Sequence, residues 1–256
     1  MNSAVSPPAS RSDGDSEPTQ QAAILPPKAN RKRSASAVDV RIYKAVFAAV
    51  MSRRLPPGTR LAEAELSYLY QVSRTTVRKA LQRLAHDYIV ELRPNRGAVV
   101  ASPTPTEARE IFEARRLIER AVIPLVIKNA TPESLQRLHK SISIEHNAVV
   151  SGDRAEWIRL GGEFHILLAE LAGNSVLLRF ASELVSRCSL IIALYESPGA
   201  PMCEDDDHQR LVQHIELNQP EAAITLMESH LREIEERLQL DATDKSINLA
   251  DMLSGY

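Results

Sequence analysis

The fold is decided by the stretch Val72-Ser73-Arg74-Thr75-Thr76-Val77-Arg78-Lys79-Ala80-Leu81-Gln82-Arg83-Leu84. Ser73 is a favourable helix N-cap, because its side-chain oxygen can accept a free backbone NH of the first turn. Apolar residues then recur at helical spacing and predict one buried stripe: Val77, Ala80, Leu81 and Leu84. Basic and hydroxyl side chains fall mostly off that stripe: Arg74, Thr75, Arg78 and Lys79. Arg can bond guanine and Thr suits phosphates, so this face can bind DNA. An ordinary solvated amphipathic helix has the same pattern.

The neighbouring segments favour the DNA-binding interpretation. Residues 39–53 predict an amphipathic helix that is broken at Pro56-Pro57-Gly58, and residues 61–70 predict a second, short helix. Two short helices joined by a tight turn, the second of them basic, form a helix-turn-helix. Residues 88–100 contain two β-prone runs around a turn with arginines, which predicts a hairpin. A helix-turn-helix followed by such a hairpin is a winged helix.

This region resembles the GntR family of bacterial transcription regulators. The matching features follow one another over residues 39–101: Leu55-Pro56-Pro57-Gly58-Thr59-Arg60-Leu61, Glu65-Leu66, the stretch 72–81, and Arg96-Gly97. The resemblance implies that recognition-helix residues contact operator DNA and that the wing glycine approaches the minor groove. The candidate DNA-binding residues are Arg74, Thr75, Thr76, Arg78, Lys79, Arg96 and Gly97. Some relatives carry a DNA-contacting Arg where this chain has Ala64, so that contact is missing here.

Charge divides the chain into unlike parts. Residues 39–101 hold 11 Lys and Arg against 5 Asp and Glu, whereas residues 102–256 hold 15 against 25. The formal net charge of −2 therefore hides a basic DNA-binding domain followed by an acidic domain. Residues 1–38 are rich in Ser, Pro, Ala and Gln and predict a disordered tail. Its basic end is either a solvated linker or an arm that adds phosphate contacts.

Several features bear on where the protein acts. The chain has no run of about 18 apolar residues, so we expect no membrane span, and its start lacks a signal-peptide pattern. Its two cysteines, Cys188 and Cys203, have no CxxC spacing. We therefore expect a cytoplasmic protein associated with the nucleoid.

From Thr104 onward the pattern is helical almost throughout. Start signals such as Thr131-Pro132-Glu133 and Asp153 alternate with breaks, as at Gly173-Asn174. The predicted helices are 105–129, 132–150, 153–172, 174–196, 204–218 and 220–241. The expected fold is thus mostly α: a winged helix followed by an antiparallel helical bundle over 102–243, with a tail over 244–256.

Three histidines lie on predicted helices of this bundle: His165, His208 and His230. A lone histidine is more often a core or surface residue, but bundles also build metal sites from inward-facing side chains of several helices. Imidazole suits Zn or Ni, and a site with carboxylate or water also admits Mn. Spacing alone does not establish such a site.

The layout of the bundle resembles the FCD domain of the FadR-type subgroup. The matching pieces are Glu113–Glu119, Phe164-His165, Leu171–Asn174, Asp207-His208 and Met227–Leu231. The resemblance implies a divalent metal held by the three histidines and one Asp. The Asp position is occupied here by Gly161, so that ligand is missing, and Glu204, one turn before His208, is a candidate substitute. The alternative is that metal binding has lapsed and the histidines bind the effector directly.

Arg115 aligns with an arginine that lines the effector cavity in metal-binding members of that subgroup. Its guanidinium can clamp a carboxylate through two hydrogen bonds. The competing interpretations are a surface salt bridge with Glu119, one turn on, and a role for the adjacent Arg116 instead. An Arg beside a metal favours a small acidic effector.

The predicted function is that of a homodimeric repressor that binds an inverted-repeat operator and is relieved by a small acidic metabolite. A metal-dependent enzyme acting on small acids is one alternative. We do not expect an enzyme, because no acid–base or nucleophile–base spacing accompanies the histidines. A non-switching DNA-architectural protein is the other alternative, and the large acidic bundle argues against it.

Overall fold

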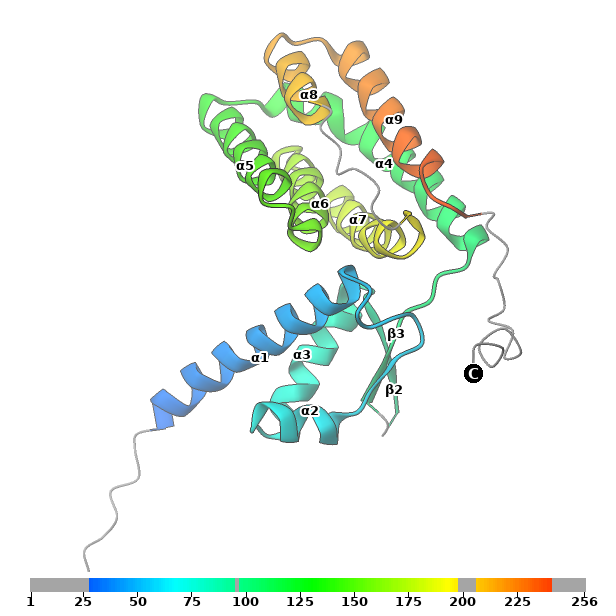
Figure 1. Cartoon of the computed structure of the whole chain (residues 1–256). Helices are drawn as coiled ribbons and strands as arrows, with labels where there is room; N and C mark the ends of the chain where they lie inside the picture. The colour runs from blue at the N-terminus through cyan, green and yellow to red at the C-terminus, as the bar shows by residue number, and fades with distance from the viewer. Residues whose placement is uncertain (1–27, 95–96, 198–205, 241–256) are drawn as a thin grey trace, which may run out of the picture.

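The structure is a computed structural model of the whole chain and describes residues 28–94, 97–197 and 206–240. In that part a winged-helix unit lies against a bundle of long helices (Figure 1). The winged-helix unit comprises α1 (Lys28–Met51), β1 (Arg60–Leu61), α2 (Glu63–Tyr70), α3 (Arg74–His86), β2 (Val90–Arg93) and β3 (Gly97–Val100). The bundle comprises α4 (Pro105–Asn129), α5 (Pro132–Ser151), α6 (Arg154–Leu171), α7 (Ser175–Tyr195), α8 (Asp207–Glu216) and α9 (Pro220–Glu236). The predicted mostly-α fold is confirmed.

The small sheet has one strand more than the sequence predicts. Its order is β1-β3-β2, and both neighbouring pairs are antiparallel. Leu61 pairs with Ala98, so residues 60–61 form a strand and α2 begins only at Glu63. The assignment of residues 61 and 62 to a helix was therefore wrong. Backbone hydrogen bonds to β3 hold this pair of residues in an extended conformation, and their own sequence gives no sign of that partner.

The first helix also differs from the prediction. It begins at Lys28, whereas the sequence predicts a start at 39 and a disordered segment before it. The prediction of disorder is wrong for residues 28–38. The sequence from 28 to 51 contains neither Pro nor Gly and is rich in Ala, Lys and Arg, so a helix can extend toward the N-terminus at low cost. The remainder of the predicted N-terminal tail, and the whole C-terminal one, lie outside the described residues.

Side-chain caps open several helices, and those at Ser73, Thr131 and Asp153 lie where the sequence predicts. The Ser73, Thr104, Asp153 and Asn174 side chains each accept a backbone NH of the first turn that follows. Thr131 forms a capping box with Ser134, in which each side chain accepts the other residue's backbone NH. Helices α4–α9 pack so that two apolar cores form inside the bundle.

A third apolar core joins the winged helix to the bundle. It contains winged-helix residues such as Val50 and Leu81 together with Ile158 of α6 and Leu190 and Ala193 of α7. The DNA-binding unit therefore rests on the same two helices that form one wall of the bundle's cavity, described below.

Candidate functional site

The exposed face of α3 presents most of the predicted DNA-binding side chains. Arg74, Thr75, Arg78 and Lys79 are exposed, while Val77, Ala80, Leu81 and Leu84 are buried, as the helical spacing predicts. Thr76 is different, because it is only 9% exposed and its hydroxyl lies 3.0 Å from Ser73 Oγ. Thr76 thus belongs to the N-cap of α3 rather than to the exposed face.

Arg78 is held in place by α2. Its Nε donates to Glu63 Oε1 at 2.9 Å and its Nη2 to Glu63 Oε2 at 2.8 Å. This two-point contact fixes the guanidinium plane at the surface, and the hydrogen bond from Arg78 holds the pKa of Glu63 below its usual value. No local sequence pattern points to Glu63, since it and Arg78 lie 15 residues apart on two helices. A base or phosphate that binds Arg78 has to share it with Glu63 or displace Glu63.

The wing glycine is tightly packed against β1. Gly97 is buried, has φ of +85°, and a Cβ on it would meet the Leu61 carbonyl oxygen at 2.2 Å. Glycine is required here for close packing of β3 on β1, so Gly97 has a structural role, and its approach to DNA stays a prediction. Arg96 lies outside the described residues.

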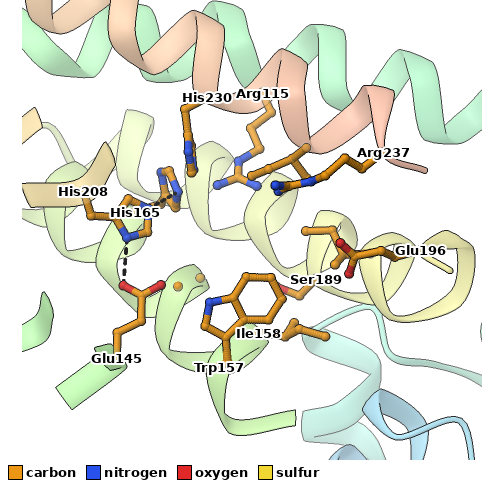
Figure 2. Close-up of a pocket in the computed structure, with 14 residues that line it drawn as sticks. Arg115, Glu145, Trp157, Ile158, His165, Ser189, Glu196, His208, His230 and Arg237 are labelled. Carbon is orange, nitrogen blue, oxygen red and sulfur yellow. Dashed lines mark hydrogen bonds and ion pairs between the residues drawn. The ribbon is translucent and has the colours of Figure 1, made fainter. Parts of the chain in front are cut away.

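The three histidines come together inside the bundle (Figure 2). His165 comes from α6, His208 from α8 and His230 from α9, and one ring nitrogen of each lies within 4.8 Å of the other two. The Nε2 atoms of His165 and His208 are 3.3 Å apart. Their side chains are between 3% and 13% exposed. Three imidazole nitrogens converging from three helices, one buried and two partly buried, form a set of donors suited to a Zn or Ni ion.

Each histidine is oriented by its own carboxylate. His165 Nδ1 lies 2.6 Å from Glu119 Oε2, and His208 Nδ1 lies 2.8 Å from Glu145 Oε2. His230 Nδ1 lies 3.2 Å from Asp207 Oδ2. An ionised carboxylate can only accept, so each Nδ1 carries the hydrogen and each Nε2 keeps its lone pair. Carboxylates behind metal-binding histidines characteristically play this orienting role.

Burial keeps His165 and His230 in the unprotonated form that can bind a metal. Burial lowers the pKa of His165 to about 3 and lowers the pKa of His230 as well, so both rings are neutral at physiological pH. Burial alone would raise the pKa of Glu119, but the adjacent Arg115 and His165 hold it well below its usual range. The hydrogen bond from His230 likewise lowers the pKa of Asp207. Neutral imidazoles backed by ionised carboxylates attract a cation.

Arg115 lies inside the bundle beside this cluster. Its Nε donates to Glu119 Oε1 at 2.6 Å, and its side chain is 3% exposed, so the ion pair with Glu119 exists but is buried rather than on the surface. Arg116 instead pairs with Glu235 of α9. Of the two adjacent arginines, Arg115 is the one that lines the cavity with the histidines.

The cavity extends from the histidines toward the winged helix. Figure 2 shows Trp157 and Ile158 of α6 and Glu196, just after α7, on the side away from His208. Arg237 lines it as well, and the cavity volume is about 70 Å³. A cavity lined by basic, aromatic and imidazole groups can hold a small polar molecule.

At Gly161 and Glu145 the cluster differs from what the sequence predicts. Gly161 stands where the resemblance places a ligating Asp, and it does line the cavity. Its proposed substitute Glu204 lies outside the described residues. The carboxylate found beside Gly161 is that of Glu145, which comes from α5 and which the sequence analysis did not identify. No sequence spacing connects it to the histidines, because the contact is made between helices.

Comparison with known proteins identifies both parts of the chain. Residues 39–100 match the family described as bacterial regulatory proteins, gntR family, and residues 110–233 match the FCD domain. The chain belongs to the GntR family. It is a transcriptional regulator with an N-terminal helix-turn-helix and an FCD ligand-binding domain, as its sequence motifs predict.

Relatives of this regulator carry matching names. It is 26% identical over 188 residues to the uncharacterized HTH-type transcriptional regulator YdhC of Bacillus subtilis, covering 72% of this chain and 83% of that one. It is 28% identical over 135 residues to the HTH-type transcriptional repressor RspR of Escherichia coli, covering 53% of this chain and 59% of that one.

Solved structures share the fold. A GntR regulator from Rhodococcus sp. RHA1 superposes with a TM-score of 0.64 at 22% identity, covering 82% of this chain and all of that one. E. coli McbR/YncC superposes with a TM-score of 0.61 at 18% identity, covering 78% of this chain and 97% of that one. Among the residues that the structure describes, none of the helices is both long and apolar enough to cross a membrane.

Proposed function

We propose that this GntR regulator is a homodimeric repressor whose affinity for an inverted-repeat operator is controlled by a small acidic metabolite bound beside a divalent metal. The observation that carries the proposal is the convergence of His165, His208 and His230 on a cavity, each with a carboxylate behind it. A protein of this kind acts in the cytoplasm, on the nucleoid. The domain limits proposed are 39–101 for DNA binding and 102–243 for effector binding and dimerisation.

The residues present fit a metal. His165, His208 and His230 would hold it through their unprotonated nitrogens, and a Zn or Ni ion suits this donor set better than Mn. A bound ion would supply positive charge and open coordination positions for an acidic ligand. Arg115 and Arg237, which line the same cavity, are the candidate partners for the rest of that ligand.

DNA binding is proposed to rest on the exposed face of α3. Arg74, Thr75, Arg78 and Lys79 would enter the major groove. Arg96 is a further candidate for DNA contact. Dimerisation would place two such helices in successive grooves, which is why an inverted repeat is expected.

The junction between the two domains offers a physical link between ligand and DNA. Arg53, after α1, donates to the backbone carbonyls of Ala193 and Glu196 at the end of α7. Glu196 is 3% exposed, lines the cavity, and pairs through its side chain with Arg154. A ligand that moves this cavity wall would also move the winged helix attached to it. Such a ligand shifts DNA affinity only if it prefers one of the two arrangements.

A thermal-shift screen of small organic acids, run with and without EDTA, tests the proposal. A ligand at about 100 times its dissociation constant should stabilise the native state by about 2.7 kcal/mol. Stabilisation that disappears with EDTA is the expected result. Stabilisation that survives EDTA would mean that the cavity binds its ligand without a metal, and no stabilisation by any acid would contradict the sensor role.

A further inference from the structure

Gly161 and Glu145 lie next to each other at the proposed metal centre, and the role proposed for them rests on that centre. Gly161 lies one helical turn before His165 on α6. A Cβ built there would stand 3.1 Å from Glu145 Oε1, which is closer than an ordinary van der Waals contact. The space beside residue 161 is therefore occupied by a carboxylate that comes from another helix, α5.

Glu145 is fixed in that space by a histidine of the cluster. Its Oε2 accepts from His208 Nδ1 at 2.8 Å, and both side chains are largely buried, at 12% and 13% exposure. Its other oxygen faces Gly161. The Glu145 carboxylate thus lies against the first turn of α8 and the middle of α6. Through Glu145, helix α5 joins the cluster although it provides none of the three histidines.

Glu145 differs in its ion-pair partners from Glu119 and Asp207, the carboxylates behind the other two histidines. Glu119 is paired with Arg115, and Asp207 is paired with Arg210. Over residues 28–94, 97–197 and 206–240, the ion pair found for Glu145 is the one with His208. A divalent cation on the far nitrogen of that ring would therefore have the Glu145 carboxylate directly behind its ligand.

We propose that Glu145 is the positioning residue of this metal centre and that glycine at 161 is what admits it. Glu145 holds His208 with Nε2 directed at the cluster, so the ligands that the described residues present to a metal are three nitrogens. A longer residue at 161 would force the Glu145 carboxylate to shift from this position. Gly161 and Glu145 together therefore set the metal preference. They favour Zn²⁺, which binds imidazole well, over Mn²⁺, which prefers oxygen ligands.

Metal titration of the full-length protein tests this inference, with Zn²⁺ and Mn²⁺ themselves as the probes. Loss of an outer carboxylate typically costs 10- to 100-fold in metal affinity, and we expect Glu145→Gln to lower Zn²⁺ affinity by about that factor. The matched control is Glu216→Gln, which removes a carboxylate 2.7 Å from another histidine, His139, on the surface. The control should bind Zn²⁺ as the parent does, and EDTA-treated samples of both variants should melt at the parent's temperature.

A second pair of variants separates positioning from packing. Gly161→Asp introduced alone brings two carboxylates into one space and should not tighten Zn²⁺ binding. Introduced into the Glu145→Ala protein, it should recover most of the lost Zn²⁺ affinity and raise the affinity for Mn²⁺ relative to Zn²⁺.

Equal Zn²⁺ affinities for Glu145→Gln and Glu216→Gln would overturn the inference. It would also be overturned if Gly161→Asp changed Zn²⁺ affinity by the same factor in the parent and in the Glu145→Ala protein. A parent protein that binds neither metal would overturn the proposed metal centre itself, and this inference with it. Loss of effector response with intact metal binding would contradict only the proposed sensor function.

Discussion

Replacing Arg53 with Ala should loosen the attachment of the winged helix to the bundle. Arg53 donates to two backbone carbonyls, those of Ala193 and Glu196, at the end of α7. Hydrogen bonds from a charged donor contribute about 1.5–3 kcal/mol each. Arg53 is only half-buried, so water takes over part of this role in the variant. We therefore expect the free energy of unfolding to fall by about 2–3 kcal/mol.

The chain provides its own reporter for this measurement. Trp157 is the only tryptophan in the sequence and packs against the core that joins the two domains. Urea unfolding followed by its fluorescence should therefore report on the junction directly. With a slope of about 2–3 kcal/mol per molar urea, the expected loss moves the midpoint down by roughly 1 M.

The neighbouring Arg54 is the matched control. It is exposed and its Nε donates to Ser52 Oγ at 3.0 Å, so Arg54→Ala should change the free energy of unfolding by less than about 0.5 kcal/mol. If the two alanine variants unfold at the same urea concentration, Arg53 does not hold the domains together and the proposed link between cavity and DNA loses its physical basis.

Three further predictions concern the wing, the recognition helix and the histidines. In thermal unfolding, Gly97→Ala should destabilise the protein by at least about 2 kcal/mol more than Gly58→Ala. Both glycines have positive φ, which costs roughly 1–2 kcal/mol for Ala. Of the two, only Gly97 would place a Cβ against backbone atoms, those of Leu61. Equal losses would argue against close packing there. Arg78→Ala should weaken specific operator binding by about 1–3 kcal/mol in a gel-shift titration, and unchanged affinity would remove it from base recognition. His208→Ala should leave operator affinity intact but blunt the effector response, a result that equal effector sensitivity in variant and parent would refute.

Local signals in the sequence predicted most of the helices. Caps such as Ser73 and Asp153 act within one turn of themselves, and the apolar stripe of α3 is read from its own spacing, so both are visible in a single stretch. The strand β1 is not visible in this way. It is two residues long and is held by pairing with residues 98–99, far along the chain.

The candidate site likewise contains residues that the sequence predicts and residues that only helix packing brings in. The three histidines were predicted from their positions in a resemblance, and the structure brings them together. Their carboxylate partners depend on how helices pack. Glu145 lies 63 residues from His208 in sequence, and Glu119 lies 46 from His165. Such contacts have no period or motif, so sequence reasoning did not find Glu145 and treated Glu119 only as the partner of a surface arginine.

The central claim is that this chain recognises a specific operator as a dimer. We would select a binding sequence from a pool of random duplexes with the full-length protein, and then titrate the selected duplex and a scrambled one at the same salt concentration. The account predicts an inverted repeat that binds two chains and is preferred over the scrambled duplex by about 10³-fold or more. A preference near one would contradict it and would favour a protein that binds DNA without reading its sequence.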